Sequence, residues 1–213
     1  FYTRGRTERL TPSRLQRKDT MKQIITLTAL FSMAFTLAAN DWPNWRGPNF
    51  NGSTDAVGLP AKFSKTENIA WSTAMPGPSA ATPIIWKDKI FVSSSDPKAK
   101  ELLAMCLSRT TGKVLWRQVV GSGFQRDNRS NYASPSPATD GKVVVFFYGN
   151  GDLAGFDLEG KQVWSKPMKA HKIRYEWGTA ASPVLHGDRL YVIDDNEEES
   201  TLTSYAKKTG EQK

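Results

Sequence analysis

The residues able to do chemistry in this 213-residue chain are few and scattered. His171 and His186 are its two histidines, and their spacing fits no common pair of metal ligands, so we expect both to be surface residues. Cys106 is the single cysteine, which excludes an internal disulfide and any paired-cysteine metal or haem motif. We expect its side chain to behave as a small buried hydrophobic group.

One acidic run is a candidate ion site. Residues 194–199 are Asp-Asp-Asn-Glu-Glu-Glu, and carboxylate and amide oxygens are ligands that Ca²⁺ accepts. The run lacks the glycine and the spacing of an EF-hand loop, which favours a solvated loop between two strands. Gly112-Lys113 and Gly160-Lys161 lack the rest of a phosphate-binding loop and are expected in turns. The sequence therefore assigns no catalytic residue and no metal ligand.

Two polar and aromatic stretches are better suited to binding. They precede the Ser-Pro pairs at 134–135 and 182–183, and each lies within a 19-residue interval from a tryptophan to a proline. The corresponding interval from Trp71 to Pro83 is 12 residues. Loops that open onto the mouth of a scaffold often carry ligand contacts. The alternative is that these loops only cover the mouth of the ring. The candidate contacts are Arg129, Asn131, Tyr132, Tyr175, Glu176 and Trp177.

The elements that must position these loops follow a repeat. Trp71, Trp116 and Trp164 are 45 and 48 residues apart, and the intervals hold short β-type runs such as 143–148 and 190–193. A period near 45 residues is typical of a propeller, in which four-stranded blades surround a channel. The predicted fold is an all-β propeller of four-stranded antiparallel blades, here an incomplete arc of about three blades.

Each predicted unit begins with a proline element and ends with a tryptophan. The proline elements are Ala-Thr-Pro at 81–83 and Ala-Ser-Pro at 133–135 and 181–183. We expect the tryptophan to lie on the outermost strand, opposite a small residue, where its ring covers the junction with the next blade. An early strand around residues 69–71 is expected to complete a further blade. The third unit is predicted to be cut one residue before its tryptophan.

The end of each unit carries a recognisable pattern, Ala-x-Asp-x-x-Thr-Gly-x-x-x-Trp. Cysteine and serine replace alanine and aspartate in the first unit, and the second is one residue shorter between aspartate and glycine. The pattern resembles the tryptophan-docking motif of propellers similar to pyrroloquinoline quinone (PQQ) dehydrogenases, which PQQ-like repeat proteins without quinone share. Residues 41–48, followed by Gly52, are also similar to the opening of secreted PQQ-like propellers. The motif positions, with the earlier tryptophan, are Trp71, Cys106, Gly112, Trp116, Asp157, Gly160, Trp164 and Gly210.

This resemblance covers about residues 41–213 and implies two functions. One is a non-catalytic binding or scaffold propeller of the bacterial envelope, similar to an outer-membrane assembly lipoprotein, with a protein, peptide or carbohydrate ligand at its loop face. The alternative is a dehydrogenase of alcohols or sugars that uses PQQ and Ca²⁺. That family usually has adjacent cysteines near the quinone, which Cys106 alone cannot supply. The binding propeller, monomeric at full length, is the preferred hypothesis.

The chain start has its own organisation. Residues 21–39 have the basic start, short apolar middle and small-residue end of a secretory signal peptide. Residues 1–20 are expected to be upstream sequence or a mis-assigned gene start; the alternative is a basic arm ahead of a membrane anchor. An N-terminal arm at 40–65 and propeller blades at 66–213, truncated at the C-terminus, complete the predicted layout. The expected location is periplasmic or secreted, with no membrane span in the mature chain.

The net charge belongs mostly to the leader. Seven of the 29 basic and two of the 21 acidic residues lie in residues 1–39, which leaves 22 and 19, a net of +3 against +8 for the whole chain. A mixed-sign chain of this kind gives no reason to expect nucleic acid as a partner.

Overall fold

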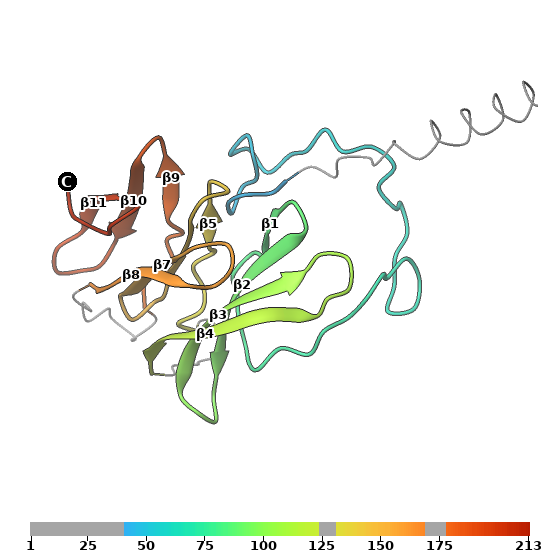
Figure 1. The fold of residues 1–213 in the computed structure, drawn as a ribbon, viewed down its shortest axis with the longest axis horizontal. Helices are drawn as coiled ribbons and strands as arrows, with labels where there is room; N and C mark the ends of the chain where they lie inside the picture. The colour runs from blue at the N-terminus through green and yellow to red at the C-terminus, as the bar shows by residue number, and fades with distance from the viewer. Residues whose placement is uncertain (1–40, 124–130, 169–177) are drawn as a thin grey trace, which may run out of the picture. The chain divides into compact units, whose positions relative to one another are not determined.

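The computed structural model describes residues 41–123, 131–168 and 178–213, and residues 39–213 form one compact unit. The eleven strands of the described residues make three antiparallel sheets with strand orders β1-β2-β3-β4, β5-β6-β7-β8 and β9-β10-β11 (Figure 1). We call these sheets blades 1, 2 and 3. Their strands are β1 Ile84–Trp86, β2 Lys89–Asp96, β3 Glu101–Ser108 and β4 Val114–Ser122; β5 Ala138–Thr139, β6 Val144–Phe147, β7 Asp152–Phe156 and β8 Gln162–Pro167; β9 Val184–His186, β10 Arg189–Asp194 and β11 Thr201–Ala206.

Blade 3 also shows the beginning of a fourth strand. Gln212 pairs with Tyr205 in an antiparallel bridge, and Lys213 N donates to Ser204 O at 2.9 Å. The pairing matches Val114 with Leu107 in blade 1 and Gln162 with Phe156 in blade 2. All three sheets therefore follow one four-stranded plan, and the chain is an incomplete arc of about three propeller blades, as the repeat predicts.

The blades pack through aromatic and aliphatic side chains. Between blades 1 and 2, Phe91 of β2 lies against Trp116, whose ring also stacks on Phe156 at 5.8 Å and meets Phe146 edge-on at 6.2 Å. A second core joins blades 2 and 3 and includes Trp164. Side chains alternate between the two faces along a strand, so β3 places Leu102, Ala104 and Cys106 in the core shared with blade 2 and Leu103, Met105 and Leu107 on its other face.

One register assignment from the sequence is wrong. The proline that precedes β5 is Pro137, just as Pro83 and Pro183 precede β1 and β9, so the second unit begins at Ser136-Pro137 and not at Ser134-Pro135. The interval from Trp116 to the proline is accordingly 21 residues instead of 19. The sequence Ser-Pro-Ser-Pro offers two matches two residues apart, and such a shift leaves every side chain on the same face of a strand.

Residues 69–71, predicted to complete a further blade, belong to no sheet of the described residues, and Ile69 is 48% exposed. A strand needs a partner with free backbone groups, and none of the described residues pairs with this segment. Trp71 is held by a side-chain contact, described below.

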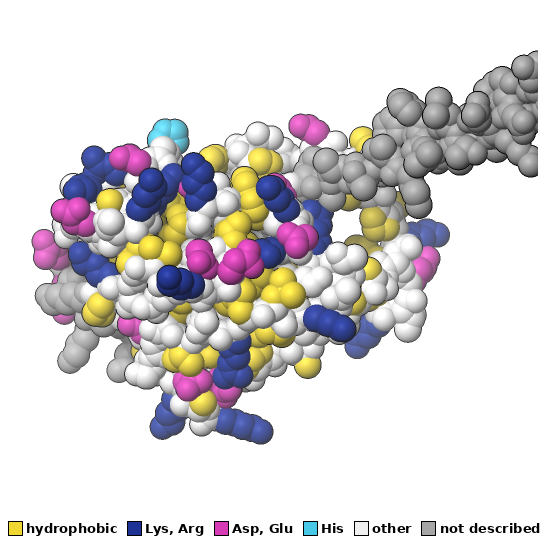
Figure 2. Space-filling model, in the orientation of Figure 1, with side chains coloured by type: hydrophobic (Ala, Val, Ile, Leu, Met, Phe, Trp, Pro, Cys, Tyr) yellow, Lys and Arg dark blue, Asp and Glu magenta, His cyan; other side chains and the backbone are white. Residues whose placement is uncertain are grey.

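The visible face carries both signs of charge. Lys and Arg side chains alternate with Asp and Glu over the blades, with apolar atoms between them (Figure 2). This distribution agrees with the balanced charge of residues 40–213 and forms no single-sign patch on this face.

Candidate functional site

Three tryptophans make the same contact with the following blade. The indole Nε1 of Trp71, Trp116 and Trp164 donates to the carbonyl of Arg109, Leu158 and Lys207, at 2.8, 3.1 and 2.8 Å. Trp116 and Trp164 lie on β4 and β8, the outer strands of their blades. Each acceptor follows the motif aspartate or its substitute, Ser108, Asp157 or Ala206. Trp71 therefore makes with blade 1 the same contact that Trp116 makes with blade 2 and Trp164 makes with blade 3.

Each ring also covers a glycine. A Cβ atom built on Gly112, Gly160 or Gly210 would lie 2.3, 2.6 or 2.8 Å from the ring of Trp71, Trp116 or Trp164, nearer than real side chains approach. All three glycines have positive φ, between 68° and 87°, which other residues rarely adopt. Both the ring and the backbone conformation therefore require glycine in this turn.

The small residue on the pairing strand serves the same packing. Cys106 pairs with Trp116, and Gly155 pairs with Trp164, where a Cβ would lie 2.5 Å from the ring. Cys106 is fully buried, and this burial raises the pKa of its thiol to about 12. The thiol is therefore protonated at neutral pH, and the residue acts as a small hydrophobic group.

The shorter turn of the second unit does not displace the contact. Gly112 and Gly210 N donate to the carbonyl four residues back, each at 2.8 Å, whereas Gly160 N donates to Asp157 O, three residues back, at 3.2 Å. The Asp157 carboxylate accepts the N–H groups of Glu159 and Lys161 at 3.0 and 2.8 Å. This side chain closes the tighter turn and keeps Gly160 under Trp116.

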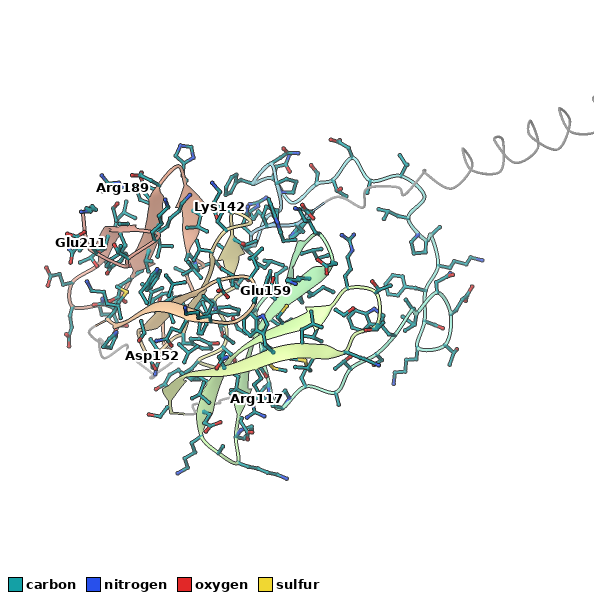
Figure 3. All side chains as sticks on the ribbon, viewed as in Figure 1. Arg117, Lys142, Asp152, Glu159, Arg189 and Glu211 are labelled. Atoms are coloured by element: carbon teal, nitrogen blue, oxygen red, sulfur yellow. The ribbon has the colours of Figure 1, made fainter. Side chains whose placement is uncertain are left out.

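Ion pairs also cross the junctions between blades 1 and 2 and between blades 2 and 3, which we call seams. Lys89 of blade 1 lies 3.5 Å from Glu159 of blade 2, at the junction seen in Figure 3. Asp140 of blade 2 pairs with Lys207 of blade 3 at 2.5 Å. Partial burial alone would raise the pKa of Asp140, but hydrogen bonds from Lys207 and from backbone N–H groups of Val143 and Lys142 outweigh it, so this pKa lies below its ordinary value.

The opposite ends of the blades form the candidate binding face. Gly149 N, in the turn after β6, donates to Tyr132 O at 2.7 Å, and Thr179 N donates to Gly149 O at 3.2 Å. These bonds join the loop that leads into blade 2, a turn of blade 2 and the loop that leads into blade 3. We call residues 131–132, 148–151 and 178–179 the loop face.

Two predicted contacts lie on this face. Tyr132 is half-buried and packs against the core between blades 1 and 2. Asn131 is 9% exposed, and its side-chain oxygen accepts the N–H of Ala133 at 2.9 Å, so it shapes the loop. The other predicted contacts, Arg129, Tyr175, Glu176 and Trp177, lie outside the described residues.

One residue of the loop face is a fully buried tyrosine. Tyr148 is fully buried, and its hydroxyl is without a hydrogen-bond partner among the described residues. Ser93 is close enough to influence it, but no hydrogen bond of acceptable geometry joins them, and the Ser93 hydroxyl donates to Pro135 O at 3.3 Å. Burial therefore raises the pKa of Tyr148 well above 10.

Nearby polar side chains are committed to packing. Asn150 Nδ2 donates to the carboxylate of Asp152 at 2.7 Å and to Ser122 O at 3.3 Å, and Asp152 lies beside the end of β4 (Figure 3). A Cβ atom at Gly121 would collide with that carboxylate. These contacts tie the loop face to the outer strand of blade 1.

The acidic run folds into a local turn. Asn196 Oδ1 accepts the N–H groups of Glu198 and Glu199 at 2.8 Å, and Ser200 Oγ donates to Asp195 at 2.8 Å. His186 is exposed at the end of β9, and His171 lies outside the described residues. Across residues 41–123, 131–168 and 178–213, no three His, Cys, Asp or Glu side chains gather as a metal site. These residues therefore hold no cluster of three or more carboxylates of the kind that Ca²⁺ takes as ligands.

Two contacts of tryptophan residues were not predicted from the sequence. Trp42 pairs through its backbone with Ile85 of β1, and the ring of Trp86 lies on Gly141, where a Cβ would come within 2.1 Å of it. Trp86 directly precedes the β1–β2 turn, as Asp140 precedes Gly141 in blade 2. The Trp42 pairing joins segments more than 40 residues apart, which no local pattern shows.

The packing plan and the repeated tryptophan contact define a PQQ-like β-propeller. The family model that matches residues 54–213 is described as outer membrane protein assembly factor BamB, and the chain belongs to this family. No curated protein sequence matches it significantly. Within the described residues, no helix is both long and apolar enough to cross a membrane.

Solved structures are similar to parts of this chain. Quinohemoprotein alcohol dehydrogenase from Comamonas testosteroni is 17% identical with a TM-score of 0.52, over 86% of this chain and 28% of that one. A europium-containing methanol dehydrogenase (16% identity, TM-score 0.49, 68% and 26% covered) and BamB from Moraxella catarrhalis (15%, 0.46, 67% and 40%) are also similar. The chain spans between 26% and 40% of the length of these three proteins. At these identities the likeness concerns the fold alone.

Proposed function

We propose that the protein is an exported, non-catalytic binding or scaffold module of the bacterial envelope, which holds a protein or peptide at its loop face. The observation that carries this proposal is the pair of backbone hydrogen bonds at Gly149, which join the loops at Tyr132 and Thr179 to a turn of blade 2. These bonds fix the arrangement of the loops before any ligand arrives, which lowers the ordering cost of binding. Membership in a family described as an outer membrane assembly factor supports a protein partner and an envelope location.

Site-specific cross-linking tests this function. A photo-reactive phenylalanine analogue at Tyr132 in the exported protein should give one discrete protein adduct in cells. The same analogue at Leu115, which is 50% exposed on β4 away from the loop face, is the matched control. Equal or absent adducts at the two positions would contradict binding through the loop face.

The alternative function is a dehydrogenase that uses PQQ and Ca²⁺ to oxidise alcohols or sugars. In such an enzyme the quinone accepts the electrons, while the protein binds and orients substrate. The structural likeness to the alcohol dehydrogenase of Comamonas testosteroni is the observation that favours this alternative. Titration of the protein with PQQ and Ca²⁺, followed by tryptophan fluorescence and by dye-linked alcohol oxidation, decides between the two. Saturable binding with turnover would replace the scaffold proposal.

A further inference from the structure

The N-terminal arm lies along the inner edges of two blades. Trp42 N donates to Ile85 O at 2.9 Å, and Ile85 N donates to Trp42 O at 2.8 Å, so the arm adds a short antiparallel pairing to β1. The next residue, Pro43, accepts the N–H of Thr139 in β5 at 2.9 Å. One short segment thus binds the innermost strands of both blade 1 and blade 2.

These edges are the ones that border the axis of a propeller. The strands β1 and β5 are the first in their sheets and pair on their other sides with β2 and β6. In a propeller the first strand of each blade faces the central channel, where its unpaired backbone groups meet water or ligand. Here the arm supplies those partners at Ile85 and Thr139.

The arm is anchored at the end of the blades opposite the loop face. The carboxylate of Asp41 accepts the N–H of Lys87 at 2.6 Å, in the turn between β1 and β2. The equivalent turn of blade 2, at 140–142, lies at the start of β6, whereas the loop-face residues 148–151 follow the end of β6. The arm and the loop face therefore occupy different ends of the inner strands.

The continuation of the arm is folded back on itself. Gly47 N donates to Asn44 O at 3.0 Å, Gly52 N donates to Arg46 O at 2.9 Å, and the Trp42 ring lies over Gly47. A Cβ atom at Gly47 would come 2.8 Å from this ring, and its φ is +74°. The folded loop thus holds Trp42 in its pairing position.

We propose that residues 41–52 form a strap that ties the inner strands of blades 1 and 2 together and closes these edges to any extended ligand. A peptide that adds a strand to a sheet needs a free edge with unpaired N–H and C=O groups. At Ile85 and Thr139 the strap already uses the groups that such a peptide would need. The strap occupies these groups whichever ligand the loop face binds.

Amide hydrogen exchange on the full chain tests the strap. Gly47→Ala drives a methyl group into the Trp42 ring, whereas Gly58→Ala is a matched control, with a φ of +71° and no atom within 4 Å of the added Cβ. We expect Gly47→Ala to speed exchange at the Ile85 and Thr139 amides at least tenfold. The amide of Val145, within blade 2, should stay unchanged. Gly58→Ala should leave all three rates as they are.

A second variant adds no atoms. Asp41→Ala removes the acceptor of the Lys87 amide and should speed exchange at Lys87 and Ile85 while Val145 stays protected. Wild-type rates at Ile85 in both variants would overturn the strap, as would equal acceleration by Gly58→Ala. If Gly47→Ala unfolds the protein, the outcome rests on Asp41→Ala alone. Loop-face cross-linking from Tyr132 is scored separately, so the two proposals fail independently.

Discussion

Trp116 and Gly160 belong to different blades and are in direct contact, because the indole ring lies over the glycine. The indole N–H of Trp116 donates to Leu158 O at 3.1 Å. The glycine has a φ of +87°, so its backbone and its missing side chain are both needed. The same relationship joins Trp71 to Gly112 and Trp164 to Gly210. Pairs of this kind give the junctions between blades 1 and 2 and between blades 2 and 3 the same local contact.

Replacing the glycine should weaken the seam. We expect Gly160→Ala to lower the free energy of unfolding by about 2 kcal/mol or more, because backbone strain and overpacking act together. Gly187→Ala is the control, since Gly187 has a φ of +58° and no neighbour within 4 Å of an added Cβ. Urea unfolding measures both. Equal losses would show that only backbone strain matters.

Loss of an indole should matter only at a seam. Trp164 is 7% exposed and donates to Lys207 O, whereas Trp45 is 57% exposed. We expect Trp164→Phe to cost roughly 2 kcal/mol through the lost hydrogen bond and the void. Trp45→Phe should stay within about 0.5 kcal/mol of the wild type, as surface changes usually do. Thermal or urea unfolding distinguishes the two variants, and similar values would contradict the seam contact.

The Cys106 thiol should resist alkylation in the folded protein. Burial raises its pKa to about 12, so the reactive thiolate is scarce at pH 8 and the reagent has no access. We expect iodoacetamide to label Cys106 only after unfolding in denaturant, as read by mass spectrometry. Val119→Cys adds a thiol at a position that is 51% exposed on β4 and should be labelled at once. Prompt labelling of Cys106 in native buffer would refute its burial.

The seam between blades 2 and 3 should depend on pH. The folded-state pKa of Asp140 lies below its ordinary value of 3.8, so its ionised form stabilises the folded protein above about pH 3.8. That contribution is lost as the pH falls through the lowered pKa. Asp140→Asn should therefore destabilise the protein at pH 7, with the difference from wild type shrinking below pH 3.8. Asp188→Asn, at a carboxylate whose side chain is 90% exposed, is the control.

Tyr148 offers a test with the opposite sign. Its buried hydroxyl is without a partner among the described residues, and an unsatisfied buried hydroxyl costs about 1–3 kcal/mol. Tyr148→Phe should accordingly leave the free energy of unfolding unchanged or raise it. Tyr205→Phe is the comparison, because Tyr205 is also buried but its hydroxyl is not an unsatisfied buried group. A clear loss of stability in Tyr148→Phe would show that the hydroxyl is satisfied, for instance by an ordered water.

The repeat predicted most of the fold because its signals are local. Turn glycines such as Gly112 and β-branched runs such as 143–148 act within a few residues, so the order of the strands in the three blades was predicted correctly. The second proline element was wrong by two residues, since only pairing with β6 distinguishes Pro137 from Pro135. The pairing of Trp42 with Ile85 depends on contacts between distant segments, for which one sequence holds no periodic signal. The same limit applies to Gly149 and Thr179 on the loop face.

The tighter turn at Asp157–Gly160 shows how such an array can change over time. The indole hydrogen bond and the ring contact of Trp116 need a carbonyl and a glycine on the next blade, and both are kept in a turn that is one residue shorter. Duplicated units could therefore diverge in turn length, and acquire new loops at their far ends, while keeping this contact with the next unit.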